Sequence, residues 1–407
     1  MKILHVYDEH ERVFPGEGSG PSIVYNLAKR VAAMGHEVTI LERRWKGLKS
    51  KEKLDGINFI RIKLHFCSSI SRKEPPQVLI RKPIGLLRFI ADRTEFAIKT
   101  LIHLTKNPYD IIVLHFPFAA VILVALAKKL RPRMVYTEWI VPFPFGRISP
   151  DLYIMKRVGM TIVEHRNIYH KLVHDYKISR DKVIYIPTCV DTEEFYPQND
   201  ENVLSFLRRE FKNKYKINIS KEEIFLLYVG PFTPRKGLET LVKAVNILVN
   251  ELGHKEILLL IKATIVEKKY LDYILSLIIQ SKLTENVRVI TEHISNDEMK
   301  NLYHITDICI APFLKDGSTS VLEPLACGKP LVGAKIEELF PMIIDGWNGL
   351  LFKPGDEKDL AKKIEYLIKH PLERKRMGQK SRKLAEEEFD CKVAEKYLSV
   401  YRKLLTN

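Results

Sequence analysis

Two stretches in the second half of the sequence carry residue types that suit the binding of an anion. The first, YVGPFTPRKGLETLVKA (228–244), has the pattern of a strand that ends at Gly230, a short loop with Lys236, and a helix. An ammonium group beside a helix start adds to the positive end of the helix dipole, where an anion is already favoured. The alternative interpretation is a lysine that is simply exposed to solvent.

The second stretch, DGSTSVLEPLACGKPLV (316–332), predicts a loop that enters a helix. The first free N–H groups of that helix would belong to residues 318–321, and they would form a cradle for a diphosphate. Glu323 follows within the first turns, and a carboxylate there can accept two hydrogen bonds from a ribose diol. The alternative is an ordinary helix start, with a Ser or Thr as the cap and Glu323 reaching back to it.

Strands and helices that would position these residues alternate along the whole sequence. KILHV (2–6) and HEVTIL (36–41) read as buried strands on either side of a helix, and the same rhythm restarts at IFLLYVG (224–230). Such alternation predicts parallel sheets with crossover helices. We therefore expect an α/β protein with two facing, Rossmann-like, doubly wound domains and a cleft between them, and ligands at the carboxyl ends of the strands.

The length supports this division, because 407 residues at about 150 per domain leave room for two sizeable domains. We expect residues 1–197 to form the first domain and residues 222–387 the second. The polar segment 198–221 suits a link between them. Residues 388–407 would contain a helix that packs on its own domain or crosses back to the first one.

The net charge of +16 is concentrated in the first part of the chain. Residues 1–180 hold 31 Lys and Arg against 16 Asp and Glu, and residues 43–106 alone hold 16 against 5. A one-sided basic domain attracts an anionic partner such as lipid headgroups or phosphorylated substrates. A solvated lysine-rich surface is the alternative. Nucleic acid is the least favoured partner, because no nucleic-acid-binding motif accompanies the charge.

The five cysteines predict reduced thiols rather than a disulfide framework. They are odd in number and show no CxxC or metal-binding spacing, which suits a cytoplasmic protein, with the inner face of the membrane as its other expected place. Asp8 and Glu9 come too early for the apolar part of a signal peptide.

One apolar stretch, residues 111–127, approaches the length of a membrane span. His115 and Pro117 interrupt it. We therefore expect a strand over 111–116, a turn, and a helix over 119–130.

Four stretches, in their order along the chain, resemble the retaining glycosyltransferases of family 4. They are GSGPSIVYNLAKRVAAMGHEVTIL (18–41), VIYIPTCVDTEEFYP (183–197), YVGPFTPRKGLETLVKA (228–244), and the run from HISNDEMKNLYHITDICIAPF (293–313) to GWNGLLFKPGD (346–356). The resemblance covers nearly the whole chain. It implies the GT-B fold of two facing Rossmann-like domains and a nucleotide-sugar donor.

The resemblance also implies roles for individual residues. Lys236 would bind the donor diphosphate, Glu323 would bind the ribose hydroxyls, and the backbone of residues 318–321 would cap the phosphates. The implied donor-binding residues are Gly18, Ser19, Gly20, Gly230, Arg235, Lys236, Lys262, His293, Ile294, Gly317, Ser318, Thr319, Ser320, Val321 and Glu323. The implied acceptor-side residues are His115, Glu138 and Trp139, and those implied in catalysis are Lys236, Glu323 and Asp316.

The sequence departs from the family pattern at several of these positions. Pro231 stands where the family often has an arginine after the strand glycine, and Arg235 or Lys262 would then supply that charge. Lys315 occupies the place of the first acidic residue of a Glu-x7-Glu pattern, so Asp316 would serve in its stead. The other departures are Lys262-Ala263 for Gly-Asp, Trp139 for a histidine, and Thr188-Cys189 for Asn-Gly.

The resemblance implies a retaining glycosyltransferase that uses a UDP-, GDP- or ADP-sugar, and we expect no cofactor. Fixed N–H groups and Lys236 would stabilise the leaving diphosphate, and we expect no essential metal because no acidic pair stands in a plausible metal setting. The acceptor would be lipid-linked, anionic or a cell-surface glycan precursor, with membrane contact through residues 43–106. The alternative, motivated by the departures, is a non-catalytic nucleotide- or glycan-binding relative.

Overall fold

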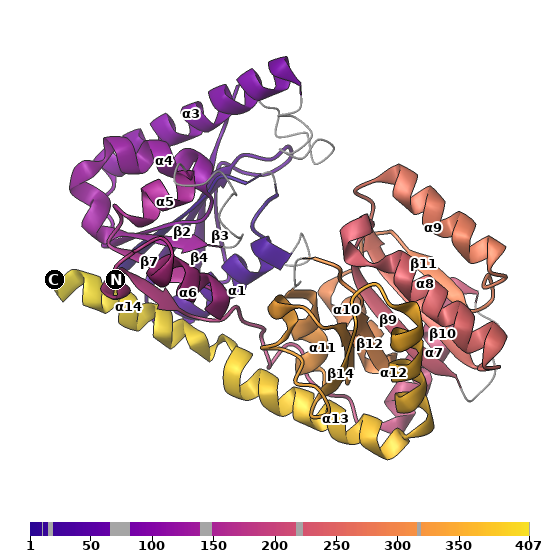
Figure 1. Cartoon of the computed structure of the whole chain (residues 1–407). Coiled ribbons are helices and arrows are strands. Elements are labelled where there is room, and N and C mark those ends of the chain that lie inside the picture. Colours follow the sequence, from indigo (N-terminus) through magenta and orange to yellow (C-terminus); the bar gives the residue numbers. More distant parts are fainter. Residues whose placement is uncertain are drawn as a thin grey trace. The chain divides into compact units, whose positions relative to one another are not determined.

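The computed structural model divides the chain into two compact units (Figure 1). Unit 1 comprises Met1–Cys189 and Cys391–Asn407, and unit 2 comprises Val190–Asp390. The structure describes residues 1–9, 11–14, 19–65, 82–138, 149–216, 223–315 and 319–406. Each unit contains its own sheet with helices on it, so the predicted fold class of two doubly wound α/β parallel-sheet domains is confirmed.

The sheet of unit 1 has the strand order β3-β4-β2-β1-β5-β6-β7-β8. Neighbouring strands are parallel except for the edge strand β3, which pairs antiparallel with β4. The strands are β1 (Lys2–Tyr7), β2 (Glu37–Arg43), β3 (Lys51–Leu54), β4 (Ile57–Ile62), β5 (Ile111–Leu114), β6 (Met134–Glu138), β7 (Met160–Val163) and β8 (Val183–Tyr185). β1, β5 and β7 are almost continuously buried, as strands covered on both faces must be.

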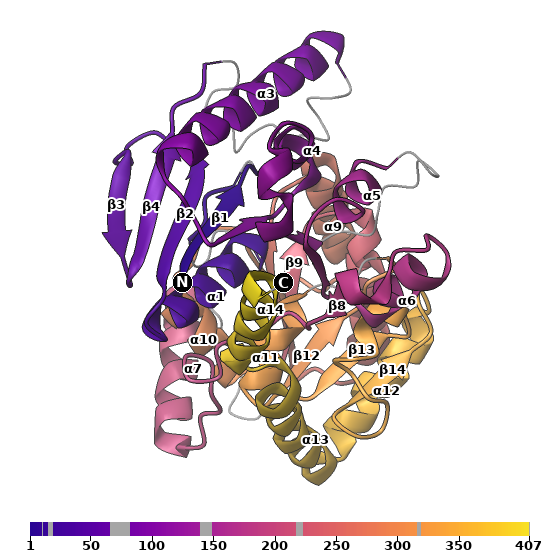
Figure 2. The same cartoon turned by 90° about the vertical axis from the view of Figure 1, so that its left-hand side faces the viewer.

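Helices cover both faces of this sheet (Figure 2). Successive side chains of a strand point to opposite faces, so Ile3 packs in one core cluster with α1 and α14, and Leu4 packs in another with α3 and α4. The helices of unit 1 are α1 (Ser19–Ala33), α3 (Pro83–Lys106), α4 (Pro117–Leu126), α5 (Pro150–Met155), α6 (Arg166–His174) and α14 (Ala394–Thr406), with short turns at η1 (Lys128–Arg133), η2 (Arg180–Lys182) and η8 (Cys391–Val393).

The sheet of unit 2 is parallel throughout, in the order β11-β10-β9-β12-β13-β14. Its strands are β9 (Ile224–Pro231), β10 (Ile257–Thr264), β11 (Val287–Ile290), β12 (Ile308–Ala311), β13 (Leu331–Ala334) and β14 (Gly349–Phe352). Its helices are α7 (Glu201–Tyr215), α8 (Leu238–Asn246), α9 (Lys268–Gln280), α10 (Asn296–Ile305), α11 (Leu322–Ala326), α12 (Glu357–Lys369) and α13 (Pro371–Leu384). Shorter helical segments are η3 (Pro234–Lys236), η4 (Ile247–Glu251), η5 (Thr319–Val321), η6 (Glu337–Leu339) and η7 (Ala385–Phe389).

The strands predicted from apolar runs are present within one to three residues of their expected ends. The apolar stretch 111–127 divides as predicted into strand β5 and helix α4, although α4 begins at Pro117 and ends at Leu126. No helix in the described ranges combines the length and the apolar composition that a membrane crossing requires.

The segment 198–221 differs from its predicted role as a link between domains. Its described part contains the 15-residue helix α7, which belongs to unit 2. Asp200 caps the helix by accepting hydrogen bonds from the backbone of residues 202 and 203. Leu207, Phe211 and Tyr215 pack against the core of unit 2. These three residues stand four positions apart, and most of the residues between them are charged. The polar composition of the segment therefore conceals its apolar stripe.

The last segment of the chain belongs to unit 1. Helix α14 contacts α1, and Tyr397, Leu398, Val400 and Tyr401 lie in the same core cluster as the α1 residues. The structure therefore has the C-terminal helix in the unit that also holds the N-terminus.

Candidate functional site

The strand order of unit 2 changes direction beside its first strand. β10 follows β9 in sequence and pairs with it on one side, whereas β12 pairs with it on the other. The loops after β9 and β12 therefore leave the sheet next to each other, at the position where doubly wound sheets bind ligands. Both stretches that carry the predicted donor chemistry begin at these two strand ends.

The two loops are held together by close backbone contacts. The N–H of Leu314 donates to the carbonyl of Arg235 at 2.9 Å. Gly237 has φ +68°, and a Cβ there would lie 1.9 Å from the carbonyl oxygen of Pro312. Only glycine fits both the left-handed conformation and this close approach. The loop that carries Lys236 is thus fixed against the loop after β12.

Lys236 is largely buried at this junction, with 5% of its surface exposed. It ends the short turn η3, and its ammonium group lies 4.6 Å from the centre of the Phe313 ring, a distance typical of cation–π attraction. A partly desolvated ammonium group interacts more strongly with a phosphate than one in bulk water. The alternative of a merely solvent-exposed lysine is therefore wrong.

Glu323 is held by a residue from another helix. The hydroxyl of Tyr303, in α10, donates to its Oε2 at 2.6 Å. Burial raises the pKa of the Glu323 carboxyl to about 6, and the Tyr303 hydrogen bond partly opposes that shift. The pKa of Tyr303 lies well above its usual value because of its own burial and the neighbouring carboxylate. The tyrosine thus fixes the carboxylate through one oxygen.

The helix start before Glu323 differs in detail from its prediction. Residues 319–321 form the turn η5, and α11 that follows has only five residues. Val321 is the N-cap of α11 and provides no side-chain cap to it. The Ser320 hydroxyl donates to the carbonyl of Val229 at 3.2 Å, which joins this turn to the end of β9. A helix this short has a small dipole, so an anion at its start would interact mainly with the individual N–H groups.

The other predicted donor residues of unit 2 lie on the same or neighbouring strand ends. Gly230 follows Val229, and a Cβ there would lie 2.7 Å from the Tyr228 hydroxyl. Lys262 pairs in register with Val229, and burial lowers the pKa of its ammonium group. Arg235 and His293 are exposed, whereas Ile294 is buried before α10.

The predicted residues of unit 1 divide between strand ends and the start of α1. Ser19 begins α1, Gly20 lies beside the Tyr7 hydroxyl, and Glu138 ends β6. Gly18, Trp139, Asp316, Gly317 and Ser318 lie outside the described residues.

His115 is buried at the end of β5 with both ring nitrogens in contact with polar groups. Its Nε2 lies 2.9 Å from Nδ1 of His5, and its Nδ1 lies 2.8 Å from the Thr137 hydroxyl. Burial lowers the pKa of His5 to about 4 and that of His115 well below its usual value. The imidazole pair is therefore neutral at physiological pH, and it fixes the strand ends of unit 1 from inside.

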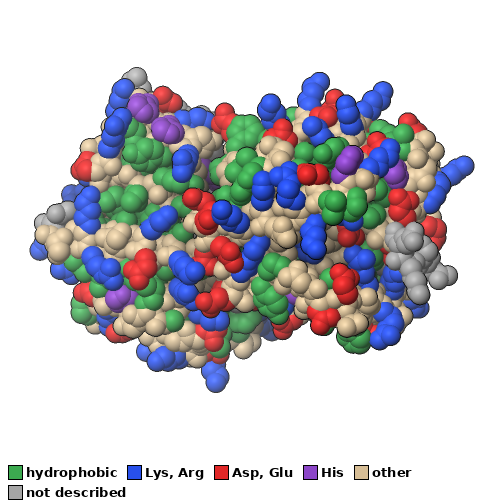
Figure 3. Space-filling model, turned by 90° about the horizontal axis from the view of Figure 1, so that it is seen from below, with side chains coloured by type: hydrophobic (Ala, Val, Ile, Leu, Met, Phe, Trp, Pro, Cys, Tyr) green, Lys and Arg blue, Asp and Glu red, His purple; other side chains and the backbone are tan. Residues whose placement is uncertain are grey.

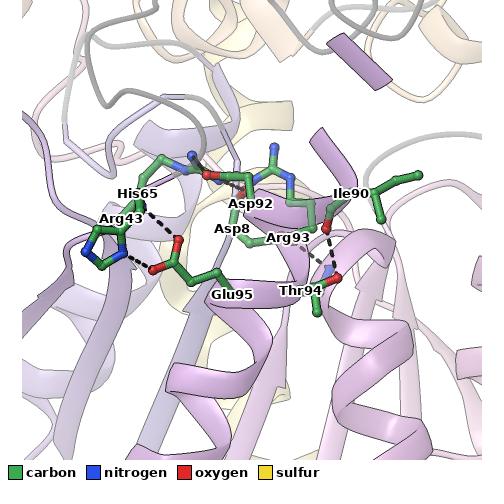
Figure 4. A network of polar contacts seen from close by, with 9 residues as sticks. Asp8, Arg43, His65, Ile90, Asp92, Arg93, Thr94 and Glu95 are labelled. Carbon is green, nitrogen blue, oxygen red and sulfur yellow. Dashed lines mark hydrogen bonds and ion pairs between the residues drawn. The ribbon is translucent and has the colours of Figure 1, made fainter. Parts of the chain in front are cut away.

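Sequence reasoning missed a buried ionic network in unit 1 (Figure 4). The guanidinium of Arg43 pairs with Asp92 at 2.7 Å and donates to the carbonyl of Asp8 at 3.2 Å. The Asp8 carboxylate accepts from the N–H of Ala119, near the start of α4, at 2.8 Å. Arg93 lies beside Asp92 and is also buried. The network joins the ends of β1 and β2 to α3 and α4.

This network corrects the simple charge count of the basic block 43–106. Arg43, Arg61 and Arg93 are buried, and Arg61 pairs with Glu42 at 2.8 Å. These three cations therefore contribute little to the surface potential. No signal along the sequence could separate them from surface arginines, because their acidic partners are 9, 19 or 49 positions away or lie in the same helix.

The models of two protein families match the sequence, one in each half. Glycosyltransferase Family 4 matches residues 22–194, and Glycosyl transferases group 1 matches residues 209–384. Serotype-specific mannosyltransferase WbdA of Escherichia coli is 29% identical over 224 residues, which are 54% of this chain and 24% of WbdA. The chain spans between a quarter and a half of the length of curated relatives of this kind.

Solved structures share the fold over the whole chain. Sucrose-phosphate synthase from Thermosynechococcus elongatus has a TM-score of 0.79 at 18% identity, with 100% of both chains covered. Anabaena HepE, solved in complex with UDP, has a TM-score of 0.74 at 16% identity, with 98% of both chains covered. The two family matches together span most of the sequence, and the neighbours have the GT-B architecture. The chain belongs to the group 1, family 4 glycosyltransferases.

Proposed function

We propose that this chain transfers a sugar from a nucleoside-diphosphate sugar to an acceptor, and that unit 2 binds the donor. The observation that carries the proposal is the gathering of Lys236, Ser320 and Glu323 at the adjoining ends of β9 and β12. Family membership supports the activity. HepE, solved with UDP-glucose, supports a nucleoside diphosphate as the ligand of this fold.

In this proposal each group has one task. Lys236 and the N–H groups near Ser320 and Val321 bind the diphosphate, and Glu323 accepts hydrogen bonds from the ribose diol. As the sugar–phosphate bond breaks, negative charge grows on the departing diphosphate, and donors already fixed in place stabilise it without reorganisation. Because Lys236 supplies a cation, we propose transfer without a metal, and with retention of anomeric configuration as the family resemblance implies.

We propose roles for further residues in each unit. On the donor they are Gly18, Ser19, Gly20, Gly230, Arg235, Lys262, His293, Ile294, Gly317, Ser318 and Thr319, with Asp316 as an additional catalytic carboxylate. On the acceptor side they are His115, Glu138 and Trp139. For His115 we propose an indirect role, because the structure has both its nitrogens in buried contacts.

A panel of UDP-, GDP- and ADP-sugars tests the proposal directly. Mass spectrometry would detect hydrolysis or transfer, and proton NMR of the product would report the anomeric configuration. Activity that persists in excess EDTA supports metal-independent transfer. Binding of a nucleotide with no turnover of any donor would instead favour the non-catalytic relative.

We propose a membrane as a second partner, because apolar and basic side chains are exposed together on α3. Ile84 and Leu87 are 69% and 68% exposed, and Ile90 is also exposed. Lys82 and Arg88 lie exposed among them. Elsewhere, on the face drawn in Figure 3, basic and acidic side chains are interspersed. An apolar helix face with flanking cations suits reversible docking on anionic lipid, which would present a lipid-linked or anionic acceptor.

Co-sedimentation with vesicles of neutral lipid, with and without a third of anionic lipid, tests this docking. We expect binding only with anionic lipid and a decrease with added salt. The double variant Ile84→Ser, Leu87→Ser should lose most of the binding, whereas Leu372→Ser, at the exposed start of α13, should not. Equal binding by all three proteins would contradict docking through α3 and leave the donor proposal intact.

A further inference from the structure

Two buried thiols from distant parts of the sequence are in contact in unit 1. The Sγ atoms of Cys189 and Cys391 lie 2.7 Å apart, although the residues are 202 positions apart in sequence. Both residues are almost fully buried, at 5% and 4% exposed. The proposed transfer reaction uses neither thiol.

The positions of these cysteines in the chain are unusual. Cys189 is the last residue of unit 1 before the chain enters unit 2, and Cys391 is the first after it returns. The whole of unit 2 therefore lies between them in sequence. A covalent bond between the two sulfur atoms would enclose residues 190–390 in one loop.

The backbone next to both thiols is held by hydrogen bonds. The N–H of Val190 donates to the carbonyl of Phe389 at 2.8 Å, and Val190 forms a parallel bridge with Asp390. The Thr192 hydroxyl donates to the carboxylate of Asp390. These contacts keep the two chain segments side by side next to the thiols.

The surroundings of the pair are apolar and aromatic. Cys189 and Cys391 belong to the core cluster that contains Tyr397 and Tyr401. Burial raises the pKa of Tyr397 well above its usual value, and the charge of Glu164 adds to that shift. Because both thiols are almost fully buried, reagents in solution should reach them slowly, and a bond between them would be shielded from reductants.

We propose that Cys189 and Cys391 form a reversible disulfide that covalently fastens residues 391–407 to the rest of unit 1. The bond forms by exchange with a small-molecule disulfide such as glutathione disulfide, through a mixed disulfide. Each cysteine loses its proton, one S–S bond forms, and the two electrons reduce glutathione disulfide to two molecules of glutathione. This site is independent of the proposed donor site in unit 2.

Peptide mapping of the full chain tests bond formation. The protein is incubated with glutathione disulfide, denatured with N-ethylmaleimide to block free thiols, and digested with trypsin. We expect a cross-linked pair of peptides, residues 183–208 and 384–392, that disappears after prior reduction with dithiothreitol. Recovery of both cysteines only as blocked thiols or glutathione adducts, even after prolonged incubation at raised temperature, would overturn the proposal.

Thermal unfolding provides a second measurement on the same samples. A disulfide that closes so long a loop restricts the unfolded chain, so the oxidised protein should melt about 5 °C or more above the reduced protein. Cys189→Ala and Cys391→Ala should each abolish that difference, and Cys309→Ala, a buried thiol of unit 2, should preserve it. A difference that persists in both single variants would overturn the assignment, and the peptide map of the unaltered chain holds even if a variant fails to fold.

Discussion

Lys236 is the residue on which the donor site depends most. Its ammonium group is largely buried against Phe313, and the loop that carries it is fixed by the backbone of Pro312. A surface lysine would have to lose conformational freedom to bind a phosphate. Lys236 has already lost that freedom on folding, so the proposed binding of a diphosphate would not carry this cost.

Replacing this ammonium group should weaken nucleotide binding. We expect Lys236→Ala to raise the Kd for the preferred nucleoside diphosphate by about 10- to 100-fold, the usual effect of losing a charge-assisted hydrogen bond. Isothermal titration calorimetry measures it, with Lys358→Ala, an exposed lysine of α12, as the control. An unchanged Kd for Lys236→Ala would remove this residue from the site.

Glu323 should give nucleotide binding a characteristic pH dependence. Its carboxyl has a pKa of about 6, so the ionised form that accepts hydrogen bonds from a ribose diol becomes dominant above that pH. We expect Glu323→Gln to bind the nucleoside diphosphate about tenfold more weakly than the unaltered protein at pH 8. The difference should shrink towards pH 5. Titration of the ligand's own phosphate affects both proteins equally, so a pH-independent ratio of the two Kd values would contradict the ribose role.

Glu164, which follows β7, should affect stability rather than binding. Burial raises the pKa of its carboxyl from 4.5 to about 8, so between these pH values the folded protein keeps a proton that the unfolded chain releases. The contribution of Glu164 to the free energy of unfolding should therefore fall as the pH rises through this window, by on the order of 5 kcal/mol, and level off above pH 8. Glu164→Gln should remove that slope in urea unfolding at successive pH values, and Glu388→Gln, an exposed residue, should keep it. Equal slopes in all three proteins would contradict a proton held at Glu164.

Only part of this residue-scale picture could be predicted from the sequence. Lys236 and Glu323 could be predicted as site residues because the strand, loop and helix around each of them are consecutive in the sequence. Tyr303, which orients Glu323, was not, because it is 20 positions away and in another helix. The contact of Cys189 with Cys391 is likewise visible only after folding. The assignment of the donor residues remains a prediction.

At the scale of elements, the closeness of the loops after β9 and β12 sets the geometry of the candidate site. Gly237 makes that closeness achievable, since any side chain would meet the carbonyl of Pro312. The strand order β10-β9-β12 places the two loops next to each other, and the lack of a side chain at Gly237 allows their backbones to come into contact.

A methyl group at position 237 should therefore disturb unit 2. We expect Gly237→Ala to lower the free energy of unfolding by about 2–4 kcal/mol, from left-handed strain together with the clash. Gly253→Ala isolates the strain, because that glycine has φ +80° and a Cβ added there would meet nothing within 4 Å, and it should cost about 1 kcal/mol. Urea unfolding measures both, and equal costs would contradict the close approach of the loops.

Secondary-structure elements could be predicted where apolar residues form a clear pattern. The prediction failed where the segment is polar in overall composition. Nearly continuous apolar runs predict β1 and β9, because a strand covered on both faces must be apolar throughout. The composition of residues 198–221 predicts a link and not helix α7, because Leu207, Phe211 and Tyr215 stand among many charged residues. The wrong prediction is confined to residues 201–215 and does not affect the predicted fold.

At the scale of the whole molecule, the sequence predicts the two sheets. It does not predict which unit the last segment of the chain joins. Alternation of strands and helices determines a doubly wound sheet whatever the side chains. The sequence does not determine where residues 388–407 pack, because the apolar face of an amphipathic helix does not specify which unit it packs against. The structure has α14 in unit 1, where it shares a core with α1.

A nucleoside diphosphate that binds only the folded protein should raise the melting temperature of the protein. At 100 times the Kd, a ligand adds about 2.7 kcal/mol to the free energy of unfolding, which corresponds to several degrees for a unit of this size. We expect one of UDP, GDP and ADP to give a clearly larger shift than the others. Shifts below one degree for all three at millimolar concentration would contradict a nucleoside-diphosphate site.

The nucleoside diphosphate with the largest shift should then be located in a crystal structure of its complex with the full chain. We expect its phosphate oxygens within hydrogen-bond distance of Nζ of Lys236 and of the N–H groups near Ser320, with its ribose hydroxyls on the carboxylate of Glu323. A nucleotide bound away from the ends of β9 and β12, touching none of these groups, would contradict the donor site.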